Sequence, residues 1–132
     1  MQVRWEDIHL DGEPEIVMRP EITKTGDRRT IKLQPNAVEW FLRCQNRTGR
    51  ISGLDSKKTM QNRMRRIRKM AGITYWPKDA MRHSYCSYHL NHFKDQGRLQ
   101  LDLGHTNPVT LHRHYHRSVS SENAARFWSL VP

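Results

Sequence analysis

The spacing of apolar residues changes near residue 34, and this change constrains the fold more than any other feature of the sequence. Before it, short alternating segments predict strands over residues 5–10, 16–19 and 30–33. The stretches between them, 11–14 and 23–29, hold Gly, Asp, Thr and Lys, which favour polar turns. Short strands joined by short turns pair as antiparallel neighbours. The beginning of the chain is therefore expected to form a small three-stranded antiparallel sheet.

Beyond residue 34 the apolar pattern becomes helical. Pro35 suits the first turn of a helix, and apolar residues follow it at helical spacing. A second helix is expected between a cap at Asp55 or Ser56 and a stop at Gly72. A small sheet followed by a mainly helical bundle is an α+β fold, and no linker divides the chain. The remaining helices are expected from near Pro77 and over 98–103, 108–116 and 120–128.

The two longest helices are expected to have faces of different chemistry. In the third, Met81, Tyr85 and Tyr88 share one stripe, which predicts core packing. In the second, an apolar stripe runs from Met60 to Ala71 at steps of four, three and four. The charge run on its other side predicts a surface that is either solvated or lies along DNA. That run comprises Lys57, Lys58, Arg63, Arg65, Arg66, Arg68 and Lys69.

The composition favours a polyanionic partner. Lys and Arg number 23 against 13 Asp and Glu, which gives a formal net charge of +10. Such an excess attracts phosphate backbones, although a basic surface without a nucleic-acid role has the same composition. Cys44 and Cys86 form no CxxC pair, so neither a disulfide framework nor a zinc motif is expected. Because no apolar run reaches membrane-spanning length and no signal peptide is visible, a cytoplasmic protein is expected.

Three separated segments carry the candidate chemistry. Arg82 lies within Asp79–Ser84, His105 follows a Leu-Gly pair, and Tyr115 comes ten residues after His105. Transesterification at a DNA phosphodiester needs a nucleophile, cations at the developing phosphorane and a proton donor for the leaving oxygen. Tyrosine, arginine, histidine and lysine fill these roles without a metal or cofactor. Arginine suits the phosphorane because its planar fork donates two parallel hydrogen bonds.

These segments resemble the C-terminal motifs of the tyrosine recombinases, the phage-integrase family. The resemblance rests on RHSYCSYHL, LGHTNPVTLHRHY and ARFWSLVP, and VRWEDIHL with ITKTGDRRTIKL is similar to the first three strands of that family's catalytic domain. It covers essentially the whole chain. It implies that residues 1–132 are part of such a domain, of bacterial or phage origin. The implied activity is site-specific recombination of double-stranded DNA by a homotetramer, with no cofactor and no membrane partner.

The resemblance assigns four catalytic residues. Tyr115 matches the nucleophile that forms a 3′-phosphotyrosine. Arg82 matches the second of two arginines that clamp the scissile phosphate, and His105 matches a histidine that contacts this phosphate and manages the tyrosine proton. Lys24 matches the hairpin lysine that protonates the 5′-oxygen. All four are expected to meet on one concave, basic face. The residues expected to contact DNA are Lys24, Arg28, Arg29, Arg82 and His105.

The sequence departs from the family pattern at two places. The position three residues before Arg82, usually a histidine, holds Asp79, whose carboxylate is expected to orient Arg82 or a helix terminus. The first clamp arginine belongs to a helix ahead of the strand at Trp5, and the sequence begins at Met1. That arginine is therefore expected to be absent, Arg4 does not match it, and the isolated chain is expected to cleave DNA poorly.

Alternative interpretations remain open. The chain is either a recombinase domain or a truncated, catalytically inactive remnant that still binds DNA, and an unrelated basic module is a third possibility. Residues 121–132, with Phe127 and Trp128, are expected to pack either on a neighbouring protomer or on the chain's own core. A histidine-rich stretch lacks carboxylate or thiolate companions, so no metal is expected. It comprises His105, His112, His114 and His116.

Overall fold

The expected sheet is present in the computed structural model, which describes residues 2–54, 56–104 and 119–132. Its strands are β1 (Ile8–His9), β2 (Glu15–Met18) and β3 (Arg29–Lys32), antiparallel and in the order β1-β2-β3. Ile16 pairs with Ile8 on one side and with Ile31 on the other. The α+β class and the small sheet are thus confirmed. The second and third strands each begin one residue earlier than predicted.

The prediction of a strand from residue 5 is wrong, because Trp5–Asp7 form a 3-10 helix, η1, ahead of β1. The Asp7 carboxylate turns back and accepts a hydrogen bond of 2.8 Å from the Arg4 backbone N–H. Its other oxygen lies 2.7 Å from Nε of Arg19, which follows β2. Asp7 is only 3% exposed. This ion pair holds the 3-10 turn against the sheet in place of an extended strand.

The connection between β2 and β3 begins with a second 3-10 helix, η2 (Pro20–Ile22). The Thr23 hydroxyl then lies 3.0 Å from the carbonyl oxygens of both Pro20 and Asp27. Gly26, with a φ of 74°, adopts the left-handed conformation that reverses the chain. The polar tip that the sequence predicts is therefore closed by its own backbone, with the Lys24 side chain exposed.

The first two helices begin and end close to residues that the sequence marks, whereas the third begins at Ala80 instead of near Pro77 and the fourth at Gln96 instead of residue 98. Pro35 opens the first, and Ser56 caps the second by accepting a hydrogen bond of 3.1 Å from the backbone N–H three residues later. Gly72, at a φ of 66°, follows the end of that helix. Asp55 and the predicted helix over 108–116 lie outside the described residues. The helices are α1 (Pro35–Leu42), α2 (Lys57–Met70), α3 (Ala80–Phe93), α4 (Gln96–Leu103) and α6 (Ser121–Trp128).

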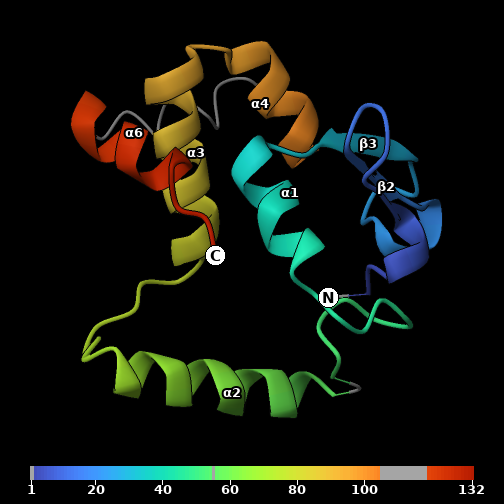
Figure 1. Cartoon of the computed structure of the whole chain (residues 1–132), viewed down its shortest axis with the longest axis horizontal. Coiled ribbons are helices and arrows are strands. Elements are labelled where there is room, and N and C mark those ends of the chain that lie inside the picture. The colour runs from blue at the N-terminus through green and yellow to red at the C-terminus, as the bar shows by residue number, and fades with distance from the viewer. Residues whose placement is uncertain (1, 55, 105–118) are drawn as a thin grey trace.

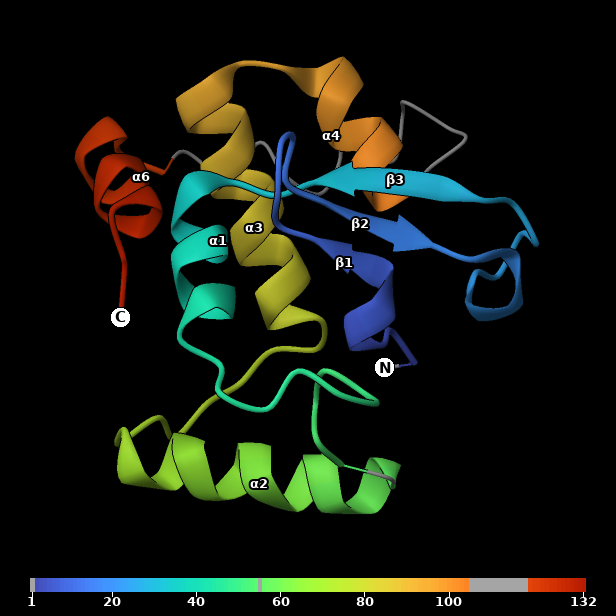
Figure 2. The same ribbon diagram turned by 45° about the vertical axis from the view of Figure 1, so that its right-hand side comes forward.

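The core lies where α3 meets α4. In Figures 1 and 2, α1 and α3 stand between the sheet and α6, and α4 lies above them. Cys86 of α3 and Leu99 and Leu103 of α4 are buried together, with Tyr85 and Leu90 packed against them. Since α4 also packs on β3, this cluster connects the helices to the sheet.

The C-terminal helix packs within the chain. The Tyr88 ring stacks on Phe127 with centroids 4.4 Å apart, and Nε1 of Trp128 donates to the Tyr88 carbonyl at 3.2 Å. Of the two interpretations of residues 121–132, the structure has the packing on the chain's own core. Tyr85 and Tyr88 are half-buried, as their stripe predicts. The prediction for Met81 is wrong: it is 66% exposed, because the ring contacts with α6 begin only at Tyr85.

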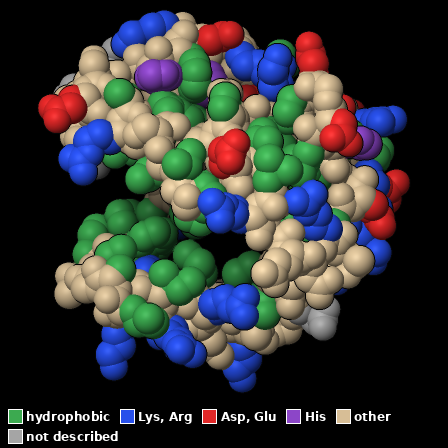
Figure 3. All heavy atoms as spheres, viewed as in Figure 1, with side chains coloured by type: hydrophobic (Ala, Val, Ile, Leu, Met, Phe, Trp, Pro, Cys, Tyr) green, Lys and Arg blue, Asp and Glu red, His purple; other side chains and the backbone are tan. Residues whose placement is uncertain are grey.

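The helix α2 lies apart from α1 and α3 in both views (Figures 1 and 2). It contains no fully buried residue, and Ile67 of its apolar stripe is 50% exposed. In Figure 3, hydrophobic side chains line a hollow between this helix and the rest of the molecule. The apolar stripe of α2 therefore faces this hollow, and its side chains are only loosely covered. The basic side of the helix remains open to solvent.

Candidate functional site

Arg82 lies in the first turn of α3 and is exposed. Residues three apart share one face of a helix, so Arg82 lies on the same side of α3 as Tyr85. The Tyr85 hydroxyl donates a hydrogen bond of 3.2 Å to Oδ2 of Asp102 on α4. The side of α3 that carries Arg82 is thus the side that turns toward α4.

Asp102 joins α3 to α4 through the hydrogen bond from Tyr85, and it also forms an ion pair with Arg98 inside α4. Besides the bond from Tyr85, its Oδ1 lies 3.0 Å from Nε of Arg98, one turn earlier on α4. Asp102 is buried, and burial raises the pKa of its carboxyl, while Arg98 and Tyr85 oppose that rise. Burial, followed by the neighbouring Asp102, also raises the pKa of Tyr85. The phenol therefore stays protonated and remains a hydrogen-bond donor.

His89 completes this polar cluster inside the helical layer. It is 1% exposed, and its ring centroid lies 5.6 Å from that of Tyr85 and 4.9 Å from that of Phe93. Burial lowers the pKa of His89, and the carboxylates of Asp102 and Asp95 oppose this in part. Among the described residues, its Nδ1 has no hydrogen-bond partner. His89 therefore packs as a neutral aromatic ring.

The sheet reaches the end of α4 through Arg29. The guanidinium of Arg29, at the start of β3, lies directly against Gly104, and a Cβ atom on that glycine would overlap it. Gly104 ends α4 at a φ of 65°. His105 follows Gly104 in the sequence. The structure thus brings one of the predicted DNA contacts to the residue directly before the predicted catalytic histidine.

The other predicted site residues are placed less closely. Lys24 and Arg28 are exposed in the connection between β2 and β3, and the structure does not bring Lys24 beside Arg82. In Figures 1 and 2 this connection lies at the outer end of the sheet, away from the first turn of α3. His105 and Tyr115 lie outside the described residues. The convergence of the four catalytic residues on one face stays a prediction.

Asp79 occupies the N-cap position of α3. Its φ of 55° is left-handed, and its side chain makes no capping hydrogen bond, although its backbone carbonyl accepts a bond of 2.9 Å from the His83 N–H. An acidic group at a helix N-terminus is favoured by the helix dipole. Asp79 thus lies at the helix terminus without a capping bond from its side chain, and the role expected for its carboxylate stays a prediction.

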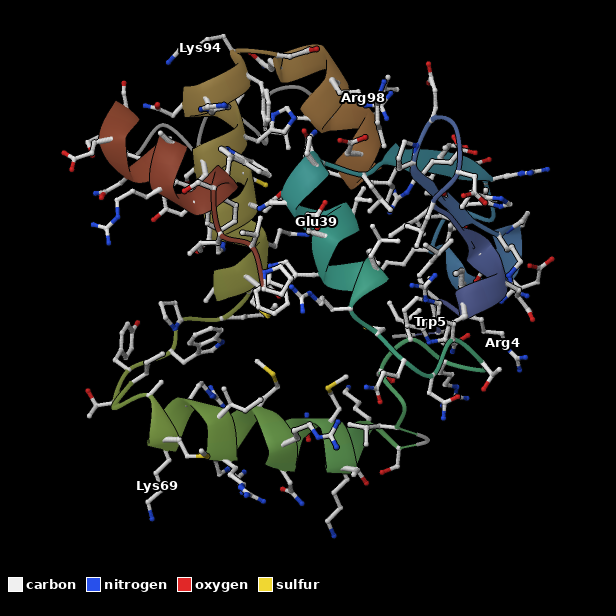
Figure 4. The ribbon with its side chains drawn as sticks, in the orientation of Figure 1. Arg4, Trp5, Glu39, Lys69, Lys94 and Arg98 are labelled. Carbon is white, nitrogen blue, oxygen red and sulfur yellow. The ribbon has the colours of Figure 1, made fainter. Side chains whose placement is uncertain are left out.

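The basic side of α2 is a second candidate surface. Lys57, Lys58, Arg65, Arg66 and Lys69 are all exposed. Lys69 points away from the rest of the molecule (Figure 4), and Lys and Arg side chains project along the outer edge of this helix (Figure 3). A row of exposed cations of this kind attracts a polyanion such as a phosphate backbone.

Two features escaped the sequence reasoning. Tyr85 and Asp102 are 17 residues apart, and no local pattern indicates that they bond. Trp76 lies outside every predicted helix, yet its ring makes a cation–π contact with Arg68. The guanidinium carbon of Arg68 lies 5.4 Å from the centre of the ring. An aromatic pair directly after a basic helix, Tyr75 and Trp76, is the signal that points to this contact.

Neither a metal site nor a membrane span is found within the described ranges. Those residues contain no group of three or more His, Cys, Asp or Glu side chains that could hold a metal ion. None of their helices is long and apolar enough to cross a bilayer. No protein-family model, curated protein or solved structure matches this chain.

Proposed function

We propose that this chain is a DNA strand-transfer domain of the tyrosine recombinase type. The Tyr115 oxygen forms a bond to the scissile phosphorus as the bond from phosphorus to the 5′-oxygen breaks. The tyrosine proton passes to His105, and Lys24 protonates the leaving oxygen. Arg82 stabilises the charge on the phosphorane. Attack by a 5′-hydroxyl from a second strand reverses these steps, so the phosphodiester energy is conserved without a cofactor.

The observation that carries this proposal is the contact between segments that the motifs keep far apart in sequence. The Tyr85–Asp102 bond joins the helix of Arg82 to α4. The Arg29 guanidinium lies on the residue directly before His105. A chance match to three short motifs carries no expectation that their segments contact one another. These contacts therefore support a site in which β3, α3 and the end of α4 meet, while the meeting of Lys24 with Arg82 at one phosphate rests on the resemblance alone.

A second candidate is a DNA-binding role without cleavage. The observation that favours it is the exposed basic side of α2, which contacts phosphates with no need of Tyr115. Duplex DNA is the partner in both proposals, since the net charge of +10 draws a phosphate backbone. Assembly into a homotetramer on DNA belongs to the first proposal alone, and the resemblance to recombinases is its basis.

Covalent capture separates the two candidates. The chain is mixed with a duplex carrying a nick beside the scissile phosphate, which lets the released strand diffuse away and traps the adduct. Tyr115→Phe removes the nucleophile, and Tyr88→Phe is its matched control because the Tyr88 ring stack survives the change. Arg82→Ala removes the phosphate clamp, and Arg126→Ala, an exposed arginine on α6, removes the same charge elsewhere.

Adduct that forms with the wild type, Tyr88→Phe and Arg126→Ala, and is lost with Tyr115→Phe and Arg82→Ala, supports the strand-transfer proposal. Loss of one preorganised charge contact costs on the order of 10²–10³ in rate. Duplex binding without any adduct supports the second candidate. A chain that neither binds nor cleaves duplex DNA contradicts both.

A further inference from the structure

A groove of about 450 Å³ lies where the chain turns back after α2. The left-handed Gly72 reverses the backbone and brings Trp76 against the last turns of the helix. The Arg68 guanidinium carbon lies 5.4 Å from the centre of the Trp76 ring, a cation–π contact. Arg65, Lys69 and Ile73 also line the groove. A basic wall and an aromatic wall thus face the same space.

We propose that this groove binds an unpaired DNA strand. One base stacks on the Arg68–Trp76 pair, and the adjoining phosphates contact Arg65 and Lys69. Guanidinium planes and indole rings are both surfaces on which nucleic-acid bases stack. The groove lies within the range of about 300–1,000 Å³ that holds small ligands, so it accommodates a single nucleotide.

The exposure of the two neighbouring aromatic rings favours a ligand with an apolar face. Tyr75 is 79% exposed and Trp76 is 37% exposed. Exposed apolar area costs about 25 cal/mol per Å², so large rings left in water often mark a contact surface. The ring of Trp128, by comparison, packs against Tyr85 and Phe93. Tyr75 and Trp76 are therefore available to a partner in a way that Trp128 is not.

The same features favour an unpaired strand over a duplex. In a duplex the faces of the bases are covered by their neighbours, and a helix such as α2 meets mainly phosphates. Charge alone therefore serves duplex binding, and a stacking surface adds nothing to it. An unpaired base exposes its face, and the pairing of Arg68 with Trp76 then becomes useful.

This inference rests on the proposed function only in its choice of DNA as the ligand. Exchange of strands requires the bases beside the cut to leave one partner before they pair with another. A site for unpaired DNA on the same domain holds such bases during the exchange. The groove includes none of the four proposed catalytic residues, so its role is tested without cleavage.

The test compares three labelled ligands bound to the whole chain: an oligothymidylate of about 12 nucleotides, an abasic oligomer of equal length, and a duplex. The two single strands carry the same phosphate charge, and only the first has bases. The variants are Trp76→Ala, Trp76→Phe and the matched control Trp40→Ala, an exposed tryptophan on α1. Lys69→Ala is paired with Lys58→Ala, which removes the same charge at the other end of α2.

We expect the wild type to bind the oligothymidylate about 5- to 150-fold more tightly than the abasic oligomer. Trp76→Ala brings this ratio close to one, whereas Trp76→Phe and Trp40→Ala preserve most of it. Lys69→Ala weakens binding of both single strands more than Lys58→Ala does, with the ratio unchanged. Thermal unfolding is followed for each variant, and if Trp76→Ala does not fold, the wild-type affinities for the two single strands still test the proposal.

An equal affinity of the wild type for the two single strands, or an unchanged ratio in Trp76→Ala, overturns the proposal. Displacement of the oligothymidylate by an oligoglutamate of equal charge also overturns it, because the groove then recognises acidic chains. Duplex binding measured on the same samples separates the two proposals. If duplex binding persists while the ratio is one, only the groove proposal fails, and loss of all binding contradicts the proposed function as well.

Discussion

The Tyr85 hydroxyl donates a hydrogen bond of 3.2 Å to Oδ2 of Asp102, and this bond ties the middle of α3 to the last turn of α4. The Arg98 guanidinium lies 3.0 Å from the other carboxylate oxygen. Burial disfavours the charged carboxylate and raises the pKa of Asp102, whereas the two donors favour the charge. The Tyr85 bond therefore joins α3 to the helix that ends just before Gly104, while the Arg98 ion pair lies within that helix.

Tyr85→Phe is expected to destabilise the fold by about 1–3 kcal/mol, because the buried Asp102 carboxylate loses the hydrogen bond from the Tyr85 hydroxyl. The free energy of unfolding from urea denaturation measures this. In a double-mutant cycle with Asp102→Leu, the Tyr85→Phe cost is expected to shrink, since no carboxylate is then left without its donor. Tyr88→Phe, which keeps its ring stack, is expected to change stability by less than about 0.5 kcal/mol. Additive costs in the cycle contradict the assigned bond.

Stability is expected to fall as the pH is lowered below about 6.5, because of His89. Burial lowers the pKa of His89 in the folded state, so the unfolded chain binds a proton first as the pH falls. This contribution is fully present above the unfolded pKa and is lost as the pH falls through the folded pKa. Asp102, whose folded pKa is raised by burial, acts in the opposite direction, because the folded state takes up its proton more readily than the unfolded chain as the pH falls.

Urea denaturation between about pH 7.5 and pH 5.5 measures the His89 effect. His89→Leu is expected to remove most of the slope in this window, whatever its effect on absolute stability. His92→Gln, at an exposed histidine on the same helix, is expected to keep the slope. A slope of the same size in His89→Leu indicates that another group titrates there.

The contrast between Asp7 and Ser56 shows how far the sequence predicts this fold. Ser56 caps α2 because its hydroxyl bonds the backbone three residues away, which a local pattern encodes. Asp7 is buried because Arg19, twelve residues later, pairs with it. The alternation of apolar and polar residues in a strand does not predict that contact. Chain order predicts helices and turns, whereas pairs such as Tyr85 and Asp102 depend on how α3 and α4 cross.

The candidate site divides in the same way. Arg29 is predicted from the sequence to contact DNA. In the structure its guanidinium lies directly against Gly104. The sequence did not indicate the groove at Trp76, because the contact with Arg68 arises only after the turn at Gly72 folds the chain back on α2. Residue types and their order suggested the chemistry, and tertiary contacts decide which of those residues meet.

Gly104→Ala is expected to cost about 1–3 kcal/mol of stability for two reasons. The backbone at this residue is left-handed, with a φ of 65°, and a Cβ atom would overlap the Arg29 guanidinium. Gly49→Ala is the matched control, because its φ of 67° is similar and nothing lies within 4 Å of the added atom. In an Arg29→Ala background the two alanine substitutions are expected to cost the same. Thermal unfolding of the set checks this, and equal costs in the presence of Arg29 mean that the guanidinium, at the end of a flexible side chain, moves aside without loss of stability.

Binding to duplex DNA is expected to depend strongly on salt and weakly on sequence. The net charge is +10, and the exposed cations of α2 meet phosphates, which carry no base information. The logarithm of the binding constant should fall with the logarithm of salt concentration, with a slope of about −0.9 for each phosphate neutralised.

Arg65→Ala and Arg66→Ala, on α2, are each expected to make the slope shallower by about one such contact. Arg126→Ala, which removes the same charge from α6, is expected to leave it unchanged. Affinity for two unrelated duplexes across a salt series provides the measurement. A flat response in the wild type, or equal slopes in all three variants, means that α2 does not lie along the DNA.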